Sequence, residues 1–317
     1  MIAVVGEALF DAHLDGDEFR LFPGGGPFNT AVGLARLGVP VCYLGAVSRD
    51  RLGRRLLRTL VSAGVDTSLT AGVDAPTPLA IVDPAEVEPS YSFHLTGTAH
   101  ETLHEHLLDL SNEVATLHVG TLALATNPPG DAVAAFVERR AHDRVLMVDP
   151  NIRPALVGDR RVYRRRLDRL VAVADIVKLS DSDLTWLDPD LTVAEVVGRL
   201  LDLGAGCVLV TYGPEGAEAW TGSGAWAKVP APEVTVADTI GAGDAFGGGW
   251  LSWLWRHDRL NKQGLGRIAS TELEVALRYA AAAGAAQCRR PSAWSPTAAD
   301  VEEVLRGAAR LTASHGD

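Results

Sequence analysis

Short apolar runs alternate with longer amphipathic stretches along most of the chain. The apolar runs have strand length, and the stretches between them carry apolar residues at helical spacing. This alternation is typical of βαβ units on a parallel sheet. It predicts an α/β fold with a doubly wound, mostly parallel sheet flanked by helices. The apolar runs are residues 2–6, 41–47, 145–150 and 207–213, and the helical patterns include residues 27–38, 50–64 and 160–174.

Two segments break this alternation, residues 12–22 and residues 72–95. The second contains the strand-like runs LAIVDP and YSFHL with turn residues between them and no helical pattern. Together the two segments predict a small antiparallel sheet that acts as a lid. The chain has no internal repeat, low-complexity tract or clear linker, so residues 1–317 are interpreted as one domain with a discontinuous lid.

Composition and charge argue against some classes of binding partner. The chain has 317 residues, of which 47% are hydrophobic and 22% charged, enough to bury a large core. Its formal net charge of −11 provides no basic surface for a phosphate backbone. Nucleic acid and anionic membranes are therefore not expected partners. Any anion must be bound locally, by a few arginines, backbone N–H groups or a metal ion.

The cysteines and the N-terminus indicate a cytoplasmic enzyme or binding protein. Cys42, Cys207 and Cys288 are far apart and are expected to be small apolar side chains in the interior. The first residues, MIAVVGEALF, lack a basic region, and their apolar run has only strand length. We therefore expect neither a signal peptide nor a transmembrane helix.

The stretch DTIGAGDAFGGGW, residues 238–250, combines a glycine-rich turn with the start of a helix. Unpaired N–H groups at such a helix start can bind phosphate without a lysine. The alternative is a glycine-rich corner before a buried helix. Asp244, in the first helical turn, could orient and deprotonate a hydroxyl that attacks a phosphoryl group. It could equally be a carboxylate that only complements the helix dipole.

Two further motifs offer polar side chains for a small ligand. In PGGGPFNTAVGLARLG, residues 23–38, consecutive glycines allow close approach, and Asn29 can both donate to and accept from a polyol. A turn with a helix cap is the alternative interpretation. In GEALFD, residues 6–11, Asp11 follows the first strand, where open α/β sheets bind ligands. An exposed loop carboxylate is the alternative there.

The run HETLH, residues 100–104, matches the HExxH spacing of zinc enzymes. Position 107 is a leucine rather than the glycine of the longer motif, and no neighbouring residue is identified as a third ligand. We therefore do not expect zinc catalysis.

Taken together, the two glycine-rich regions resemble the signatures of the ribokinase-like (PfkB) carbohydrate kinases, and the segments between them follow the family's order. GEALFD and DPNIRP are most similar to fructokinases. The resemblance covers nearly the whole chain. It is carried by residues 24–38, 47–68, 148–156, 177–187, 210–220 and 238–249.

The resemblance implies a role for individual residues. Asp244 would be the catalytic base, beside an anion hole formed by the N–H groups of Gly241, Ala242 and Gly243. The implied sugar-binding residues are Asp11, Gly25, Asn29 and Arg153; the nucleotide-binding residues are Thr211, Gly213 and Gly216; and the metal ligands are Asp183 for magnesium and Asp238 with the Ile240 carbonyl for a monovalent cation, usually potassium.

The implied activity is an ATP-dependent sugar kinase, most similar to fructokinases that make fructose 6-phosphate, with magnesium on the nucleotide phosphates. Kinases for 2-keto-3-deoxygluconate, ribose or nucleosides are the alternatives within the family, and a catalytically silent sugar-binding protein is the alternative outside it. A homodimer is implied by the lid strands of the family.

The chain departs from the family pattern at two positions. The magnesium-organising NxxE-type motif appears only as Ser180-Asp181-Ser182-Asp183. After the lid strand, where related kinases commonly carry a Tyr-Arg pair, the chain has His94 and Leu95. With a leucine at this position, Arg153 is the one cation in the motifs that match the family. A sugar acid needs an arginine partner for its carboxylate, so the leucine favours a neutral sugar as substrate.

Overall fold

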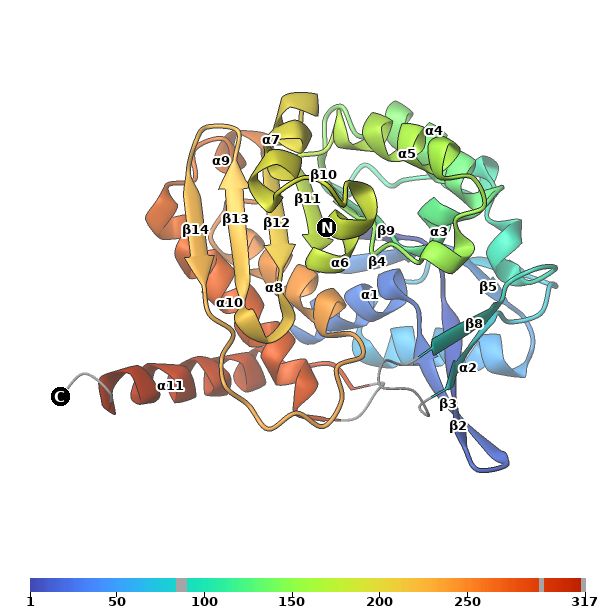
Figure 1. Cartoon of the computed structure of the whole chain (residues 1–317). Helices are drawn as coiled ribbons and strands as arrows, with labels where there is room; N and C mark the ends of the chain where they lie inside the picture. The colour runs from blue at the N-terminus through green and yellow to red at the C-terminus, as the bar shows by residue number, and fades with distance from the viewer. Residues whose placement is uncertain (84–89, 291–293, 315–317) are drawn as a thin grey trace.

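Within residues 1–83, 90–290 and 294–314, which this computed structural model describes, eight strands form the central sheet (Figure 1). Its order is β14-β13-β12-β11-β10-β9-β1-β4. The strands from β12 to β4 are parallel, and β13 and β14 add an antiparallel hairpin at one edge. The predicted mostly parallel sheet is thus confirmed. In chain order the strands are β1 (Ile2–Val5), β4 (Val41–Leu44), β9 (Thr116–Gly120), β10 (Val145–Asp149), β11 (Ile176–Ser180), β12 (Cys207–Thr211), β13 (Ala217–Thr221) and β14 (Trp226–Val229).

Helices cover both faces of this sheet because consecutive strand residues point to opposite sides. In β1, Val4 belongs to one apolar cluster and Val5 to the other. On the first face lie α1 (Gly26–Arg36), α2 (Arg51–Ala63), α8 (Ala242–Arg256), α9 (Lys262–Leu265), α10 (Ser270–Cys288) and α11 (Ala298–Ser314). On the second lie α3 (Leu122–Ala125), α4 (Pro129–Arg140), α5 (Arg160–Val171), α6 (Asp181–Leu187) and α7 (Val193–Leu203).

A second, smaller sheet stands at one end of the central sheet (Figure 1). Its order is β3-β2-β7-β8, built from β2 (Leu9–Asp15), β3 (Glu18–Gly24), β7 (Leu79–Asp83) and β8 (Ser90–His94). The separate small sheet was predicted, but not its mixed character: β2 and β7 pair in parallel. The chain leaves β2 through β3, α1 and α2 before it returns to β7, and so long a connection allows the parallel direction.

The boundaries of the small sheet also differ from the predicted segments. It begins at Leu9 rather than at residue 12, so Asp11 lies inside a strand. Residues 71–73 form β6 (Ala71–Val73), which pairs with β5 (Ala46–Ser48) in a separate ribbon. The action of the small sheet as a lid stays a prediction.

The cysteines follow the expectation in part. Cys42 and Cys207 are buried in the two apolar clusters, and Cys288 is partly exposed at the end of α10. Among the helices in the described part of the chain, none combines the length and apolar character needed to cross a membrane.

Helix α8 packs closely against α10, and glycine makes this approach possible. A Cβ atom on Gly249 would lie 2.7 Å from the Ala283 Cβ and 3.2 Å from the Ala280 Cα. The adjacent Gly248 has room, since a Cβ there would first meet Leu34 at 3.9 Å. The two neighbouring glycines of one helix therefore have different packing constraints.

Gly249→Ala should lower the free energy of unfolding by about 1–3 kcal/mol, because the added methyl group overpacks the α8–α10 interface. Gly248→Ala is the matched control and should raise it by up to about 1 kcal/mol, since alanine is the better helix former. Urea unfolding of both variants measures the difference. Equal shifts in the same direction would contradict this account of the interface.

Candidate active site

A cavity of about 270 Å³ lies where the parallel strands end beneath the small sheet. Open α/β sheets bind ligands at this position, outside the carboxyl ends of the strands. Residues far apart in the sequence meet there, from the ends of β1, β9 and β10, from β2 and β8, and from the starts of α1 and α8. The lining residues are Glu7, Leu9, Asp11, Gly25, Gly26, Asn29, Tyr91, Phe93, Thr121, Leu122, Asn151, Arg153, Thr239, Ile240, Gly241, Gly243 and Asp244.

Asp244 faces this cavity from the first turn of α8 and is only 7% exposed. Its Oδ2 accepts a hydrogen bond from the Asn29 side-chain amide at 2.9 Å. The helix begins after Gly241, whose φ of 77° favours glycine. A carboxylate and the N-terminal N–H groups of a 15-residue helix are thus brought to one cavity.

Burial raises the pKa of Asp244 to about 6. The hydrogen bond from Asn29 opposes this shift, the negative charge of Asp149 adds to it, and the positive charge of Lys178 opposes it. Asp244 is therefore mostly ionised at neutral pH but has a higher proton affinity than an exposed aspartate.

Asp11 projects into the same cavity from β2, and the facing strand leaves room for its carboxylate. A Cβ on Gly24 would lie 2.1 Å from the Asp11 Oδ2, so a larger residue at Gly24 would displace this carboxylate. Burial, and next the charge of Asp244, raise the pKa of Asp11 to about 7, whereas Arg153 lowers it.

Gly25 and Asn29 bring the start of α1 to the cavity. Gly25 precedes the helix with φ 103°, and a Cβ there would lie 2.8 Å from the Glu7 carbonyl oxygen. Both the backbone angle and the close approach require glycine. This turn lets Asn29, one helical turn later, reach Asp244.

Among the described residues, Arg153 is the one cation that lines the cavity. Its Nη1 donates to the Asn151 side-chain oxygen at 2.6 Å and to the Asn151 carbonyl at 3.2 Å. Its guanidinium carbon lies 6.0 Å from the centroid of the Tyr91 ring. Local bonds therefore hold the guanidinium at the edge of the cavity.

The predicted nucleotide-binding residues lie outside this lining, at the end of β12. Thr211 is the last residue of β12, and Gly213 begins the short 3-10 helix η4 (Gly213–Glu215). Gly216 approaches the next hairpin closely, since a Cβ there would lie 2.0 Å from the Val229 carbonyl oxygen. Their nucleotide role stays a prediction.

The predicted magnesium ligand is engaged with protein donors. Asp183 accepts from the Ile152 N–H at 2.6 Å and from the N–H and hydroxyl of Ser180, each at 2.8 Å. It thus closes a capping box at the start of α6. Within the described ranges, no group of three or more His, Cys, Asp or Glu side chains is arranged to hold a metal ion. Asp183 therefore belongs to no such cluster among the described residues.

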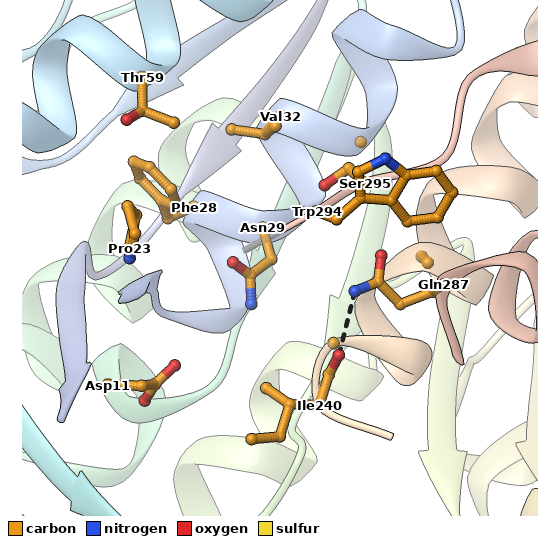
Figure 2. A pocket seen from close by; sticks show the side chains of 13 residues that line it. Asp11, Pro23, Phe28, Asn29, Val32, Thr59, Ile240, Gln287, Trp294 and Ser295 are labelled. Carbon is orange, nitrogen blue, oxygen red and sulfur yellow. Dashed lines mark hydrogen bonds between the residues drawn. The ribbon is translucent and has the colours of Figure 1, made fainter. Parts of the chain in front are cut away.

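An adjoining cavity of about 30 Å³ lies between α1 and the loop that precedes α8. Figure 2 shows the side chains that line it. It shares Asp11 and Asn29 with the larger cavity. Gln287, from the end of α10, reaches into it, and its side-chain Nε2 donates to the Ile240 carbonyl oxygen at 3.2 Å. The predicted cation ligand Ile240 therefore already has a protein donor.

Sequence reasoning missed Glu7, which stands inside the quoted motif GEALFD. Its side chain is buried, lines the larger cavity and accepts from the Ala123 N–H at 3.1 Å. Burial raises the pKa of Glu7 to about 7, hydrogen bonds from the backbone lower it, and the charge of Asp244 adds to the rise. Glu7, Asp11 and Asp244 thus place three carboxyl groups on one cavity.

A buried ion pair behind α8 was also missed. The Lys178 ammonium lies 2.8 Å from the Asp149 Oδ2, and both side chains are almost fully buried. A Cβ on Gly243 would lie 3.4 Å from the Lys178 Nζ, so the ammonium sits directly beneath the start of α8. The two residues are 29 positions apart in the sequence. The strand pattern predicts that both are buried, but nothing in the sequence predicts that they form a pair.

Leu95 follows β8 directly. Leu95 is buried in a small apolar cluster with Leu9 and Leu122 and does not line the larger cavity. Tyr91 and Phe93, two and four positions earlier, face it instead. Among the described residues that line the cavity, Arg153 is the one cation.

The zinc-like run HETLH does not form a helical face. His100 lies in the 3-10 helix η1 (Ala99–Thr102), is buried, and hydrogen-bonds through Nε2 to Thr126 at 2.6 Å. His104 follows in extended conformation and is exposed. The two imidazoles therefore lack the i, i+4 geometry that HExxH requires.

The fold and the cavity together define a ribokinase-like sugar kinase. The sequence pattern of the pfkB family of carbohydrate kinases matches residues 1–299. The chain belongs to this family.

Relatives and solved structures agree with this assignment. The chain is 37% identical over 284 residues to a fructokinase of Rhizobium leguminosarum bv. trifolii, covering 88% of this chain and 86% of that protein. It resembles the structure of a fructokinase with bound ATP from Xylella fastidiosa, with a TM-score of 0.89, 27% identity and coverage of 96% and 98%. It also resembles a fructokinase double mutant from Vibrio cholerae O395 in a form with fructose, ADP and potassium ion, with a TM-score of 0.85, 27% identity and coverage of 96% and 97%.

Glu7→Gln should stabilise the protein progressively as the pH rises from about 5 to about 8. The folded-state pKa of Glu7 is raised above its unfolded value, so the folded protein binds the extra proton in this range. Stability from Glu7 is present at low pH and is lost as the pH passes through about 7. Glutamine does not titrate, so the variant avoids this loss. Relative to the wild type, its free energy of unfolding should rise by at most about 1.4 kcal/mol for each unit by which the pKa of Glu7 is raised.

The free energy of unfolding, measured by urea titration across this pH range, gives the difference between variant and wild type. Glu233→Gln, at an exposed position, controls for the substitution itself. A difference for Glu7→Gln that stayed constant across this pH range would contradict the raised pKa of Glu7.

Proposed function

We propose that this protein transfers the γ-phosphoryl group of ATP to the 6-hydroxyl of fructose. One observation carries the proposal: Asp244, at the start of α8, shares a cavity with Asp11 and bonds to Asn29. A base, a helix N-terminus and polyol-binding side chains are the parts that phosphoryl transfer to a sugar needs. Relatives that carry the name fructokinase support the choice of sugar.

Asp244 acts as the base. The sugar hydroxyl oxygen forms a bond to the γ-phosphorus while the bond from that phosphorus to the bridging oxygen of ADP breaks. The hydroxyl proton passes to the Asp244 carboxylate. Since the pKa of Asp244 is about 6, the group is ionised before the reaction and holds the proton more readily than an exposed aspartate.

The N–H groups of Gly241, Ala242 and Gly243 form the anion hole. Gly241 is the N-cap of α8, and Ala242 and Gly243 are its first two residues, so none of the three N–H groups has a partner within the helix. The Ala242 N–H donates to the Thr239 carbonyl at 3.2 Å and would share this bond with the phosphoryl group. The helix dipole adds positive potential at the same end. Charge that develops on the transferring phosphoryl group is thereby stabilised beside the base.

Asp11 and Asn29 hold the sugar hydroxyls, and Gly25 allows the sugar to approach the backbone. A carboxyl group accepts hydrogen bonds from hydroxyl groups, and an amide both donates and accepts. Arg153 lies at the edge of the cavity, near the sugar or the transferring phosphate.

A neutral ketose fits the charges of the cavity better than a sugar acid does. The lining carries Glu7, Asp11 and Asp244, and Arg153 is the one cation among the described lining residues. Arg153 already donates to Asn151. A substrate carboxylate would enter a site in which three carboxyl groups accompany a single arginine, and repulsion between nearby carboxylates is costly.

The nucleotide site is proposed at Thr211, Gly213 and Gly216, beside the end of β12. Magnesium would arrive with the nucleotide phosphates and neutralise part of their charge, since this ion is bound mainly by phosphate and water oxygens in such sites. Asp183 would act on it only at a distance, because protein donors occupy its oxygens. A cytoplasmic location and a homodimer are part of the proposal on the resemblance alone.

Asp244→Asn should lower kcat by at least about a hundredfold and leave ATP binding nearly unchanged. Asparagine keeps the size of the side chain but cannot take the proton. Steady-state kinetics and ATP binding by calorimetry measure the two effects.

Asp11→Asn is the matched comparison for Asp244→Asn, since it alters a neighbouring carboxyl group. It should mainly raise the KM for the sugar. A variant at Asp244 that retained most of its kcat would remove this residue from the mechanism.

Fructose should be turned over with kcat/KM at least about tenfold above that for 2-keto-3-deoxygluconate, a margin of about 1.4 kcal/mol in transition-state stabilisation. ADP formation with a panel of neutral sugars, nucleosides and sugar acids measures this. A better turnover of the sugar acid would refute the charge argument. Absence of turnover with any sugar would refute the proposed function.

A further inference from the structure

The side-chain amide of Gln287 bonds to the loop that leads into α8. Its Nε2 donates to the Ile240 carbonyl oxygen at 3.2 Å (Figure 2). Gln287 is 4% exposed and stands one residue before the end of α10. A buried amide without a partner is costly, so this bond stabilises the position of both groups.

The same loop is tied to the end of α10 through its backbone. The Cys288 carbonyl accepts from the Ala237 N–H at 2.8 Å and from the Asp238 N–H at 3.3 Å. A Cβ on Gly241 would lie 3.5 Å from the Gln287 Nε2. Gln287 therefore fixes the last stretch of the loop before the anion hole begins.

This arrangement does not fit a monovalent cation on the Ile240 carbonyl. Carbonyl oxygens bind potassium by replacing its hydration shell, and the ion lies in front of the lone pairs. The N–H group of Gln287 occupies one lone-pair direction of the Ile240 carbonyl and presents a positive dipole end, which repels a cation. A bound ion would instead favour the opposite amide orientation, with the side-chain oxygen toward the ion.

We propose that Gln287 is a positioning residue that holds the Ile240 carbonyl in the place of a monovalent cation, so that phosphoryl transfer proceeds without potassium. The proposal rests on the proposed kinase function. Gln287 acts through Ile240 on the N–H groups of Gly241 to Gly243. Its effect should therefore fall on kcat more than on sugar binding.

The potassium dependence of the wild-type enzyme tests the proposal directly. Its kcat with the preferred sugar is measured with potassium chloride and with tetramethylammonium chloride at equal ionic strength, and should agree within about twofold. The wild-type Tm in the same two salts should also agree, because an ion that binds the folded state raises Tm. This second measurement remains decisive if no sugar in the panel is turned over.

Two variants test the amide. Gln287→Leu keeps the approximate size of the side chain without a donor, and should lower kcat at least about tenfold with little change in sugar KM and no rescue by potassium. Gln287→Glu places an ionised carboxylate beside the carbonyl oxygen. A cation between the two oxygens relieves their repulsion, so potassium should raise the kcat of this variant at least about fivefold.

Gln263→Leu, on the exposed surface of α9, is the control and should keep the wild-type kcat in both salts. Activation of the wild type by potassium of about tenfold or more, a potassium-dependent rise in its Tm, or an unchanged kcat in Gln287→Leu would overturn the proposal. If Gln287→Leu does not fold, the wild-type comparison and the response of Gln287→Glu decide the question.

Discussion

The burial of the Asp244 carboxylate at the start of α8 is the constraint on which the site depends. A buried charge is costly unless donors and opposite charges surround it. The Asn29 amide, the first N–H groups of the helix and the Lys178 ammonium supply that compensation. Because this compensation is incomplete, the pKa of Asp244 is raised. A raised pKa suits a group that must hold a proton during the transfer. The same environment thus explains both the stability of the carboxylate and its chemistry.

The fold provides these donors from distant parts of the chain. Parallel strands end at one edge of the sheet, so the segments after β1, β9 and β10 meet there without long loops. Close packing of α8 against α1 and α10 then aims the start of α8 into the cavity. The small sheet contributes Tyr91 and Phe93 to the lining of the cavity. The polar contacts of Asp244 are therefore held by apolar packing on the first face of the sheet.

The sequence predicted the parallel sheet well, because buried strands and amphipathic helices have different periods. It also indicated Asp11, Asn29 and Asp244 as candidates, since their motifs combine glycines with polar groups, and the structure brings these three to one cavity. The burial of Glu7, the pair of Lys178 with Asp149 and the parallel pairing of β2 with β7 could not be read from it. Each depends on which distant segments become neighbours, and local patterns do not contain that information. The same limit applies to Tyr91 and Phe93: the strand pattern shows that these residues share a face of β8, but not that this face meets the cavity.

A crystal structure with fructose and a non-hydrolysable ATP analogue would test the central claim most directly. The account predicts that the 6-hydroxyl oxygen lies about 3 Å from a carboxylate oxygen of Asp244, with the γ-phosphate analogue against the N–H groups of Gly241 to Gly243. It would be contradicted by a sugar whose reacting hydroxyl bonds to Glu7 or Asp11 while Asp244 remains bound to Asn29 alone.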